Sequence, residues 1–294
     1  MNTDNMISNP PLISPRGVHT LTGDIRHHRS FGSDILKRER DLIVYLPPDY
    51  EQTKQNGNRY PVLYLQDGQN LFDGATSFAP GKEWEVDETA EALITAGEIA
   101  PLIIVGIYNA GEARNDEYTH TQVSLRGGKN ARRQTGGLAK DYGRMLVEEL
   151  KPFIDQTYRT LPDAVNTGVG GSSLGAVVSL YLGLMYPHVF NKLALLSTSV
   201  WWDNRVLIKN VDMLPEKLPL KIWLDVGTEE GGSMMLRDTR LLCDAFVQKG
   251  WRMDGDLAYL EVHGGVHDEA AWAKRVGPFL RFLFPPASSD TSNP

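Results

Sequence analysis

GSSLG at residues 171–175 is the stretch that decides the fold of this 294-residue chain. It matches the pattern G-x-S-x-G, and it stands between an apolar run at residues 167–170 and a helical pattern that begins at Leu174. In that setting the five residues predict a sharp turn from a strand into a helix, with the hydroxyl of Ser173 exposed. Glycine suits the two outer positions, because a side chain there would meet neighbouring backbone. Without the flanking strand and helix, the same residues would indicate only a Gly-Ser turn.

Short apolar runs alternate with helical patterns on both sides of this turn. Residues 102–107 (LIIVGI) are apolar on both faces, as in a strand buried between two helical layers. Leu146, Leu150 and Ile154 fall at helical spacing, so we expect an amphipathic helix over residues 139–158. The alternation predicts an α/β fold: a mostly parallel sheet with helices on both faces, and ligands at the carboxyl ends of the strands. The other expected strands are 42–46, 62–65, 167–170, 193–196, 220–226 and 257–262, and the other expected helices are 174–185, one through 241–246 and one that contains Trp272 and Leu283.

Composition and the two chain ends favour a single domain. Hydrophobic residues make up 41% of the chain and charged residues 23%, which is ordinary for a globular protein with a sizeable core. Residues 1–18 are rich in Asn, Pro and Ser and show no periodicity, and residues 285–294 have the composition of a tail. We therefore expect one domain over residues 19–284, between a loose lead-in and a C-terminal tail.

Charge, cysteine content and hydropathy narrow the possible partners. Thirty Lys and Arg against 37 Asp and Glu give a net charge of −7, which argues against nucleic acid or an anionic membrane as the main partner. Cys243 is the only cysteine, so neither an internal disulfide nor a cysteine-based metal site can form. The sequence contains no apolar run of the roughly 18 residues that span a bilayer and no N-terminal pattern of a secretory signal. We expect a cytoplasmic protein that acts on a small molecule without metal or cofactor; its oligomeric state stays open.

A histidine is needed to take the proton of a serine nucleophile, and a carboxylate is needed to hold that histidine. With this type of turn the three residues follow one another in the order serine, acid, histidine. His267 lies in a Gly-containing loop between the last expected strand and the last helix, where an imidazole can project over the serine. We choose His267 and keep His263, at the end of the strand, as the alternative. His188 lies too close in sequence to return to the serine.

The loop after the strand at residues 220–226 offers the carboxylate. It reads Gly-Thr-Glu-Glu at residues 227–230. Glu230 is our choice and Glu229 the alternative, whereas Asp225 lies inside the strand and is less able to reach outward. Without a serine and a histidine on either side in the right order, this acidic pair would indicate a solvated turn.

Two N–H donors must stabilise the oxyanion that forms when the serine attacks an ester. One is expected from Leu174, immediately after the nucleophile, and the other from the loop after an earlier strand. The loop after residues 62–65 reads Gln-Asp-Gly-Gln-Asn, in which Gly68 permits a tight turn and Gln69 is the expected donor.

Residues 114–137 are polar, contain Gly and show no clear period. A loop of this length in a compact domain is usually functional or mobile, so we expect a flexible cover over the active site. Arg126, Lys129, Arg132 and Arg133 give it a local positive charge. Such a charge is typical of a solvated face, and it would also suit an anionic substrate.

Several segments together resemble the esterase branch of the α/β-hydrolases, which includes feruloyl and acetylxylan esterases, S-formylglutathione hydrolases, siderophore trilactone esterases and mycolyltransferases. The resemblance implies Ser173, Glu230 and His267 as a catalytic triad, with Gln69 and Leu174 as oxyanion donors. The matching segments spread over residues 42–272 and are VYLPPDY, YPVLYLQDGQNLFD, VEELKPFIDQTYRT, GGSSLGAVVSLYLG, the Trp201-Trp202 pair, LDVGTEE and HDEAAW.

The sequence departs from this family at two positions, and three tryptophans are candidates for its substrate pocket. Ala176 stands where the family often has a glycine, and Thr198 interrupts a Ser-Pro-Ser that often precedes the paired tryptophans. Trp201, Trp202 and Trp84 are candidate pocket residues, although large aromatic side chains more often pack in the core.

The leading hypothesis is a serine carboxylesterase that hydrolyses small or aromatic acyl esters through an acyl-enzyme. A siderophore trilactone esterase is one alternative, motivated by the cationic loop, and an acyltransferase is another. A binding protein that keeps the fold without catalysis is the alternative from a different class, and the intact Ser, Glu and His set speaks against it.

Overall fold

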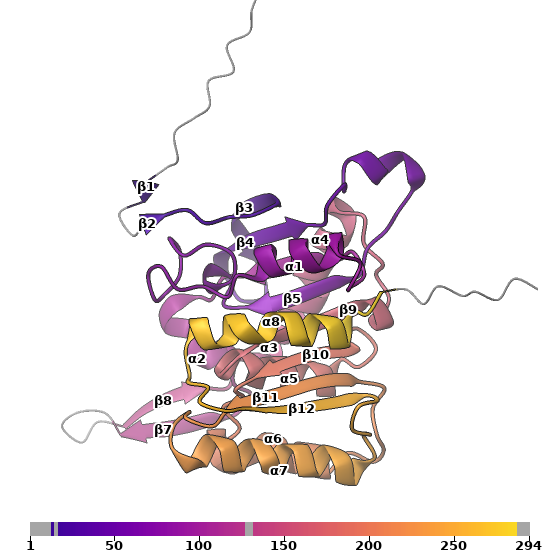
Figure 1. Ribbon diagram of the computed structural model, residues 1–294. Coiled ribbons are helices and arrows are strands. Elements are labelled where there is room, and N and C mark those ends of the chain that lie inside the picture. Colours follow the sequence, from indigo (N-terminus) through magenta and orange to yellow (C-terminus); the bar gives the residue numbers. More distant parts are fainter. Residues whose placement is uncertain (1–12, 15–16, 127–131, 287–294) are drawn as a thin grey trace, which may run out of the picture.

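The computed structural model describes residues 13–14, 17–126 and 132–286, and a single eight-stranded sheet forms its centre (Figure 1). The strand order is β12-β11-β10-β9-β5-β6-β4-β3. The six strands from β12 to β6 run parallel, β4 is antiparallel to β6, and β3 is antiparallel to β4. The expected α/β class with a mostly parallel sheet is confirmed. The strands are β3 (Asp24–Ser33), β4 (Arg38–Leu46), β5 (Val62–Gln66), β6 (Ile103–Ile107), β9 (Thr167–Ser172), β10 (Lys192–Leu196), β11 (Lys221–Gly227) and β12 (Leu257–Val262).

Helices cover both faces of this sheet. On one face α1 and α8 pack against each other, and α8 lies against β10 and β11 (Figure 1). On the other face α5 lies against β9 and β10, and α6 and α7 pack beside it. The helices are α1 (Val86–Thr95), α3 (Ala139–Arg144), α4 (Lys151–Thr157), α5 (Leu174–Met185), α6 (Trp202–Asp212), α7 (Ser233–Lys249) and α8 (Glu269–Leu283).

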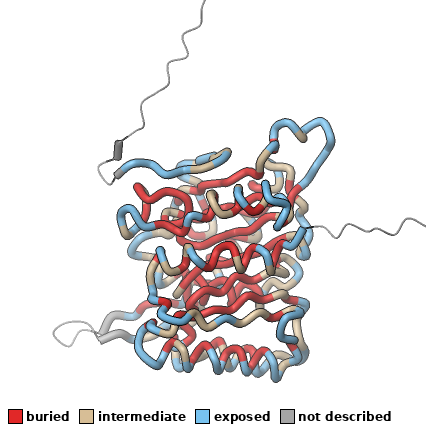
Figure 2. Tube along the Cα trace, in the orientation of Figure 1, coloured by how far each residue is buried: buried red, intermediate tan, exposed pale blue. Residues whose placement is uncertain are grey.

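The side chains of the strands alternate between two hydrophobic cores. In β5, Val62 and Tyr64 point into the core under α5, while Leu63 and Leu65 point into the core under α8. The same period of two runs through the other central strands, and Figure 2 shows them buried along their length. Burial on both faces explains why these strands appear in the sequence as continuous apolar runs.

The helix expected over residues 139–158 is continuous but not uniform. Between α3 and α4 the segment Met145–Leu150 forms a π-helical turn, and Pro152 lies at the start of α4. Proline has no N–H to donate to the preceding turn, so the usual α-helical bonding is interrupted there. The buried side chains Leu146, Leu150 and Ile154 still face the core, as their spacing predicted.

Residues 114–137 are more regular than we expected. They contain the short helix α2 (Arg114–Glu117) and an antiparallel ribbon of β7 (Gln122–Arg126) and β8 (Arg132–Gly136) that projects from the body (Figure 1). Asp116 ties the ribbon to α2, because its carboxylate accepts hydrogen bonds from Thr135 Oγ1 (2.8 Å) and Gly136 N (2.6 Å). Local polar contacts of this kind leave no periodic pattern in a sequence. The expected cover over the active site stays a prediction: Lys129 lies outside the described residues, and the side chains of Arg126, Arg132 and Arg133 are not described.

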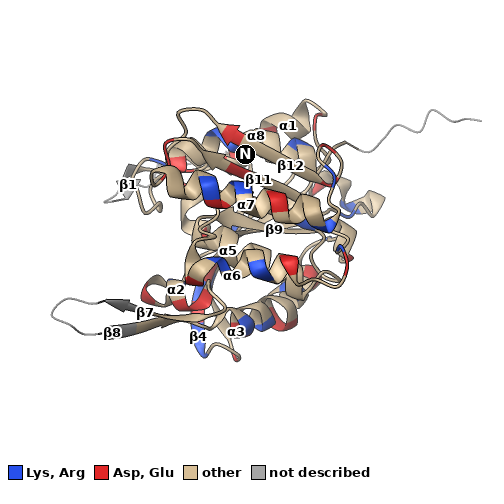
Figure 3. Ribbon diagram, turned by 90° about the horizontal axis from the view of Figure 1, so that it is seen from below, with Lys and Arg blue, Asp and Glu red and all other residues tan. Residues whose placement is uncertain are grey.

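Basic and acidic residues are interspersed along α6 and α7 (Figure 3). In the described part of the chain no helix is both long and apolar enough to pass through a bilayer.

Candidate active site

The expected site residues meet at one edge of the sheet because each follows the carboxyl end of a strand. Ser173 follows β9, Glu230 follows β11 and His267 follows β12. Gln69 follows β5, the neighbour of β9 on its other side. Parallel strands end at a common edge, so residues far apart in the sequence lie side by side there.

Ser173 occupies the sharp strand-to-helix turn that the sequence predicted. Its backbone has φ 56° and ψ −120°, a conformation that residues other than glycine rarely adopt. The flanking glycines make this turn possible. A Cβ at Gly171 would lie 3.0 Å from the carbonyl carbon of Gly175, and a Cβ at Gly175 would lie 3.0 Å from Cβ of Gln66.

His267 and Glu230 form the second part of the site. Nδ1 of His267 lies 3.0 Å from Oε2 of Glu230, which is fully buried. The imidazole is about one-third exposed and lies edge-on to the ring of Trp272, with centroids 4.9 Å apart. The bond at Nδ1 leaves Nε2 free for a substrate or a nucleophile.

A dense set of donors holds the carboxylate of Glu230. Its Oε1 accepts hydrogen bonds from Ser197 Oγ (2.7 Å), Gly227 N (2.7 Å) and Arg275 Nη2 (2.9 Å). Burial alone would raise the pKa of Glu230, but the bonds from His267, Ser197 and Arg275 outweigh it and lower that pKa below its usual value. Glu230 is therefore held as an anion beside the imidazole.

Arg275 connects Glu230 to a second buried acid. Its Nη1 lies 2.7 Å from Oδ1 of Asp225, and Oδ2 of the same carboxylate accepts a hydrogen bond from Trp223 Nε1 (2.7 Å). Burial raises the pKa of Asp225 to about 6, although the Arg275 guanidinium opposes that shift. Asp225 thus supports Arg275 rather than contacting the histidine, in line with its position inside the strand.

Ser199 is a residue of the site that the sequence did not reveal. Its Oγ lies 3.1 Å from Oγ of Ser173, within hydrogen-bonding distance. Among the described residues, Ser199 is the hydrogen-bond partner of the Ser173 hydroxyl. Ser197, two residues earlier, donates to Glu230. The loop after β10 therefore touches both the expected nucleophile and the expected acid, and the hydroxyls of its Ser-Thr-Ser are the signal that points to it.

The loop after β5 carries Gln69 in a short 3-10 turn, Gly68–Asn70. Gly68 is required there, since a Cβ would lie 2.5 Å from the carbonyl carbon of Gly106 in β6. Asp67, just before it, has φ 56°. Leu174 is the first residue of α5, where backbone N–H groups have no partner within the helix.

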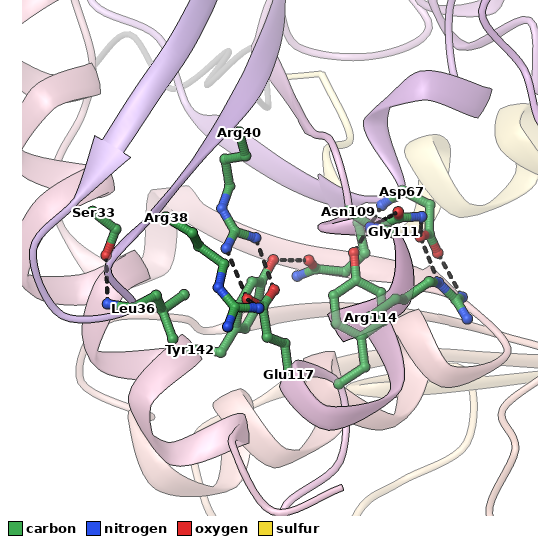
Figure 4. A network of polar contacts seen from close by, with 12 residues as sticks. Ser33, Leu36, Arg38, Arg40, Asp67, Asn109, Gly111, Arg114, Glu117 and Tyr142 are labelled. Carbon is green, nitrogen blue, oxygen red and sulfur yellow. Dashed lines mark hydrogen bonds and ion pairs between the residues drawn. The ribbon is translucent and has the colours of Figure 1, made fainter. Parts of the chain in front are cut away.

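Arg114 and Asn109 clamp Asp67 from the side (Figure 4). Arg114 donates from Nε (2.7 Å) and Nη2 (2.8 Å) to the two carboxylate oxygens, and Asn109 Nδ2 donates to Oδ1 (2.7 Å). Arg114 begins α2, and α2 ends at the buried Glu117, which pairs with Arg40 at 3.1 Å. A chain of polar contacts thus links β4 through α2 to the loop that carries Gln69.

These elements enclose a cavity of about 340 Å³ at the carboxyl edge of the sheet. Ser173, His267 and Gln69 all line it. The other lining residues in the described chain are Asp67, Asn70, Phe78, Asn109, Arg114, Ser172, Glu269 and Trp272.

The three tryptophans chosen from the sequence are not among these lining residues. Trp84 is buried in the core against Trp272, with ring centroids 5.6 Å apart. Trp202 is also buried, and its indole N–H donates to Thr121 at the base of the ribbon. Trp201 is 42% exposed and lies against Trp202. The aromatic rings that do line the cavity are those of Phe78, which lies outside the segments that resemble the family, and Trp272, which ends the matching segment HDEAAW.

The alternative residues occupy exposed positions. The two alternatives, His263 and Glu229, are exposed, and so is His188, which the sequence had excluded. The described residues contain no group of three or more His, Cys, Asp or Glu side chains arranged to hold a metal ion.

Comparison with known proteins agrees with this architecture. Residues 33–283 match the protein family described as "Putative esterase".

The chain belongs to this family.

Two similar proteins are named as esterases, and a similar structure is named as a serine hydrolase. An endo-1,4-beta-xylanase/feruloyl esterase of Xylanibacter ruminicola is 28% identical over 270 residues, which are 89% of this chain and 32% of that protein. The ferri-bacillibactin esterase BesA of Bacillus subtilis is 28% identical over 162 residues, 52% of each chain. An IroE-like serine hydrolase from Shewanella oneidensis superposes with a TM-score of 0.69 at 22% identity, covering 89% of this chain and 80% of that one. That likeness shows the same fold, as the sequence resemblance implied.

Proposed function

We propose that this member of the family is a serine carboxylesterase that hydrolyses small or aromatic acyl esters through an acyl-enzyme. One observation carries the proposal: the strained Ser173 turn lines the same cavity as His267, whose Nδ1 contacts the buried carboxylate of Glu230. Membership of the esterase family supports this proposal.

In the first half-reaction Ser173 Oγ attacks the ester carbonyl carbon, and its proton passes to Nε2 of His267. Glu230 stabilises the imidazolium that forms, because its carboxylate already contacts Nδ1. The carbonyl oxygen becomes an oxyanion, for which the N–H groups of Gln69 and Leu174 are the proposed donors. The bond to the alcohol oxygen then breaks, His267 returns the proton to that oxygen, and the alcohol leaves.

Water completes the cycle. His267 accepts a proton from water, whose oxygen attacks the acyl-enzyme, and the second tetrahedral intermediate expels Ser173 Oγ. The histidine gives its proton back to that oxygen, so the free acid is released and the enzyme is restored. If an alcohol replaced water in this step, the product would be a new ester, which is the acyltransferase alternative.

Hydrolysis of p-nitrophenyl acetate tests the proposal. Wild-type protein should release p-nitrophenol, and Ser173→Ala should reduce the rate to the background of the uncatalysed reaction. His267→Ala should also lower kcat by at least about a thousandfold. Equal rates for wild type and Ser173→Ala would refute ester hydrolysis at this site and favour a binding protein.

A siderophore trilactone is the second candidate substrate, favoured by the similarity to BesA over half of each chain. A catecholate trilactone is anionic, and positive charge on the β7–β8 ribbon would attract it. Replacing both Arg132 and Arg133 by Ala should then lower kcat/KM for an anionic catecholate ester more than for a neutral acetate. Equal effects on the two substrates would show that the charge of the ribbon does not attract the anionic substrate.

A further inference from the structure

A second cavity adjoins the catalytic one. Its volume is about 530 Å³, and Gln69, Phe78 and Asn109 line both cavities. Because three residues are shared, the two spaces are neighbouring parts of one cleft that passes across the Gln69 loop. Its further lining residues in the described chain are Ala75, Thr76, Tyr108 and Gly111.

The two parts of the cleft differ in charge. The catalytic cavity is lined by Asp67, Arg114 and Glu269 as well as His267. The described lining of the second cavity contains only uncharged residues, two of which carry the aromatic rings of Phe78 and Tyr108. A carboxylate placed there would find no cationic side chain in the described lining. The lining therefore favours an uncharged group with apolar faces.

Phe78 stands where the two cavities meet, and its backbone is held firmly. Its side chain is 85% exposed, the most exposed of the large hydrophobic side chains in the described chain. Its backbone N–H donates to Oδ1 of Asn70 (2.9 Å), and Thr76 Oγ1 donates to the carbonyl oxygen of Gln69 (2.7 Å). These bonds fix the turn to the expected oxyanion loop. An exposed ring on an anchored backbone beside a catalytic cavity is suited to contact with an aromatic or apolar ligand.

The positions of Gln69 and His267 indicate which half of an ester would occupy the second cavity. The leaving alcohol takes a proton from His267, which lines the catalytic cavity and is absent from the described lining of the second one. The acyl carbonyl oxygen is directed to Gln69, which lines both. The group that extends past Gln69, away from His267, is therefore the acyl group.

We infer that the second cavity is an acyl subsite for an uncharged aromatic acyl group, with Phe78 and Tyr108 as the rings that contact it. The inference rests on the proposed esterase function and adds the place at which acyl specificity is set.

Three p-nitrophenyl esters with the same leaving group test this subsite: the acetate, the cinnamate and the 4-carboxycinnamate. Wild-type protein should prefer the cinnamate, with kcat/KM at least about tenfold above that for its carboxylated analogue. Phe78→Ala should lower kcat/KM for the cinnamate, mainly through KM, by about tenfold more than it lowers kcat/KM for the acetate. Phe78→Tyr keeps a ring and should retain the preference.

Met213→Ala is the matched control, because Met213 is 74% exposed and lies outside the described lining of both cavities. It should leave all three esters unchanged. Equal losses for acetate and cinnamate in Phe78→Ala, or no loss for either, would overturn the subsite while leaving the esterase function intact. If wild type hydrolysed none of the esters faster than Ser173→Ala, the function on which the subsite rests would fail instead.

Discussion

At the scale of single residues, the proposed catalytic role of Glu230 depends on its neighbours as much as on its own position. A buried carboxylate is costly, and three donors to Oε1 offset that cost while Oε2 stays available to the histidine. Ser197 has a central place in this arrangement. It donates to Glu230 and accepts hydrogen bonds from Trp272 Nε1 (2.9 Å) and Arg275 Nη1 (2.8 Å).

Replacing Glu230 by Gln tests the catalytic role of this carboxylate. The amide keeps the shape but cannot stabilise the imidazolium, so kcat for p-nitrophenyl acetate should fall by at least about a hundredfold, with little change in KM. Glu229→Gln, at the exposed neighbouring position, is the matched control and should leave kcat unchanged. If the two variants behaved alike, the assignment of Glu230 would be contradicted.

Glu230→Gln also tests how the stability of the folded chain depends on pH. The pKa of Glu230 is lower in the folded chain than its usual value, so on acidification the unfolded chain takes up the proton first. The stabilisation by the carboxylate is thus complete above about pH 5, beyond the usual glutamate pKa of about 4.3, and is lost progressively as the pH falls through the lowered pKa. The free energy of unfolding of wild type relative to Glu230→Gln, measured in urea from pH 7 to pH 3, should decline at the acidic end. If this difference in the free energy of unfolding grew toward low pH, it would contradict the lowered pKa of Glu230.

Arg114 allows a test of the clamp on Asp67. Arg114→Lys keeps the positive charge but loses the two-pronged contact with the carboxylate. Since Asp67 lies two residues before Gln69, the oxyanion donor should be less well placed, and kcat should fall about tenfold while KM stays within about twofold. Arg144→Lys, at an exposed ion pair with Glu148, is the control. A change confined to KM would indicate that Arg114 binds substrate instead.

At the scale of secondary-structure elements, the turns at the carboxyl edge require glycine because backbone segments meet there. Gly227 ends β11, and a Cβ at that position would lie 2.2 Å from the carbonyl oxygen of Gly265 and 2.6 Å from Oε1 of Glu230. The loops after β11 and β12 therefore approach closely only if this residue has no side chain. This contact brings the acid and the histidine together.

Gly227→Ala should separate these two loops. We expect the free energy of unfolding to fall by about 1–3 kcal/mol or more, and esterase activity to fall further than stability explains. Gly32→Ala is the control, since a Cβ at Gly32 would meet no atom within 4 Å. Stability is measured by urea denaturation and activity by hydrolysis of p-nitrophenyl acetate. If Gly227→Ala matched the wild type in both, the close approach of the two loops would be contradicted.

Most elements were predictable from the sequence where burial leaves a pattern. The strands at 42–46, 62–65 and 193–196 and the helix at 174–185 are confirmed, since apolar runs and helical spacing report burial directly. The edge strand β3 was missed because its sequence, DIRHHRSFGS, is polar and half exposed. The β7–β8 ribbon was missed because Asp116 anchors it through polar bonds.

The site, like the fold, was predictable only where its residues leave a recognisable pattern in the sequence. Motifs and chain order sufficed to choose Ser173, Glu230 and His267, and the structure brings all three to one edge of the sheet. Phe78 and Arg114 line the cavity through tertiary contacts that leave no mark in the sequence. Ser199 was overlooked although it belongs to the Ser-Thr-Ser at residues 197–199. The tryptophans illustrate the opposite error. Trp84 and Trp202 were chosen as pocket residues because they are large aromatic residues, but both are buried in the core.

At the scale of the whole molecule, one sheet separates two hydrophobic cores and carries the site at its edge. Leu180 of α5 lies in one core and Leu280 of α8 in the other, and both are fully buried. Because α8 also carries Arg275 and Trp272, the packing of that core positions the carboxylate of Glu230. Stability and activity are thus expected to depend on both faces of the sheet.

Leu180→Ala and Leu280→Ala test this coupling. Each variant should lower the free energy of unfolding by about 2–5 kcal/mol. In each, esterase activity and far-UV circular dichroism should be lost at the same urea concentration, because both cores share one sheet. Separate transitions for the two faces would show that the cores unfold independently.

The central claim is that Ser173 is the nucleophile of a serine esterase. Labelling with a fluorophosphonate probe, followed by mass spectrometry of the proteolytic fragments, tests it most directly. We expect one adduct, on Ser173, and no adduct in Ser173→Ala. A wild-type protein that stays unlabelled, or an adduct on Ser172 or Ser199 instead, would contradict the claim.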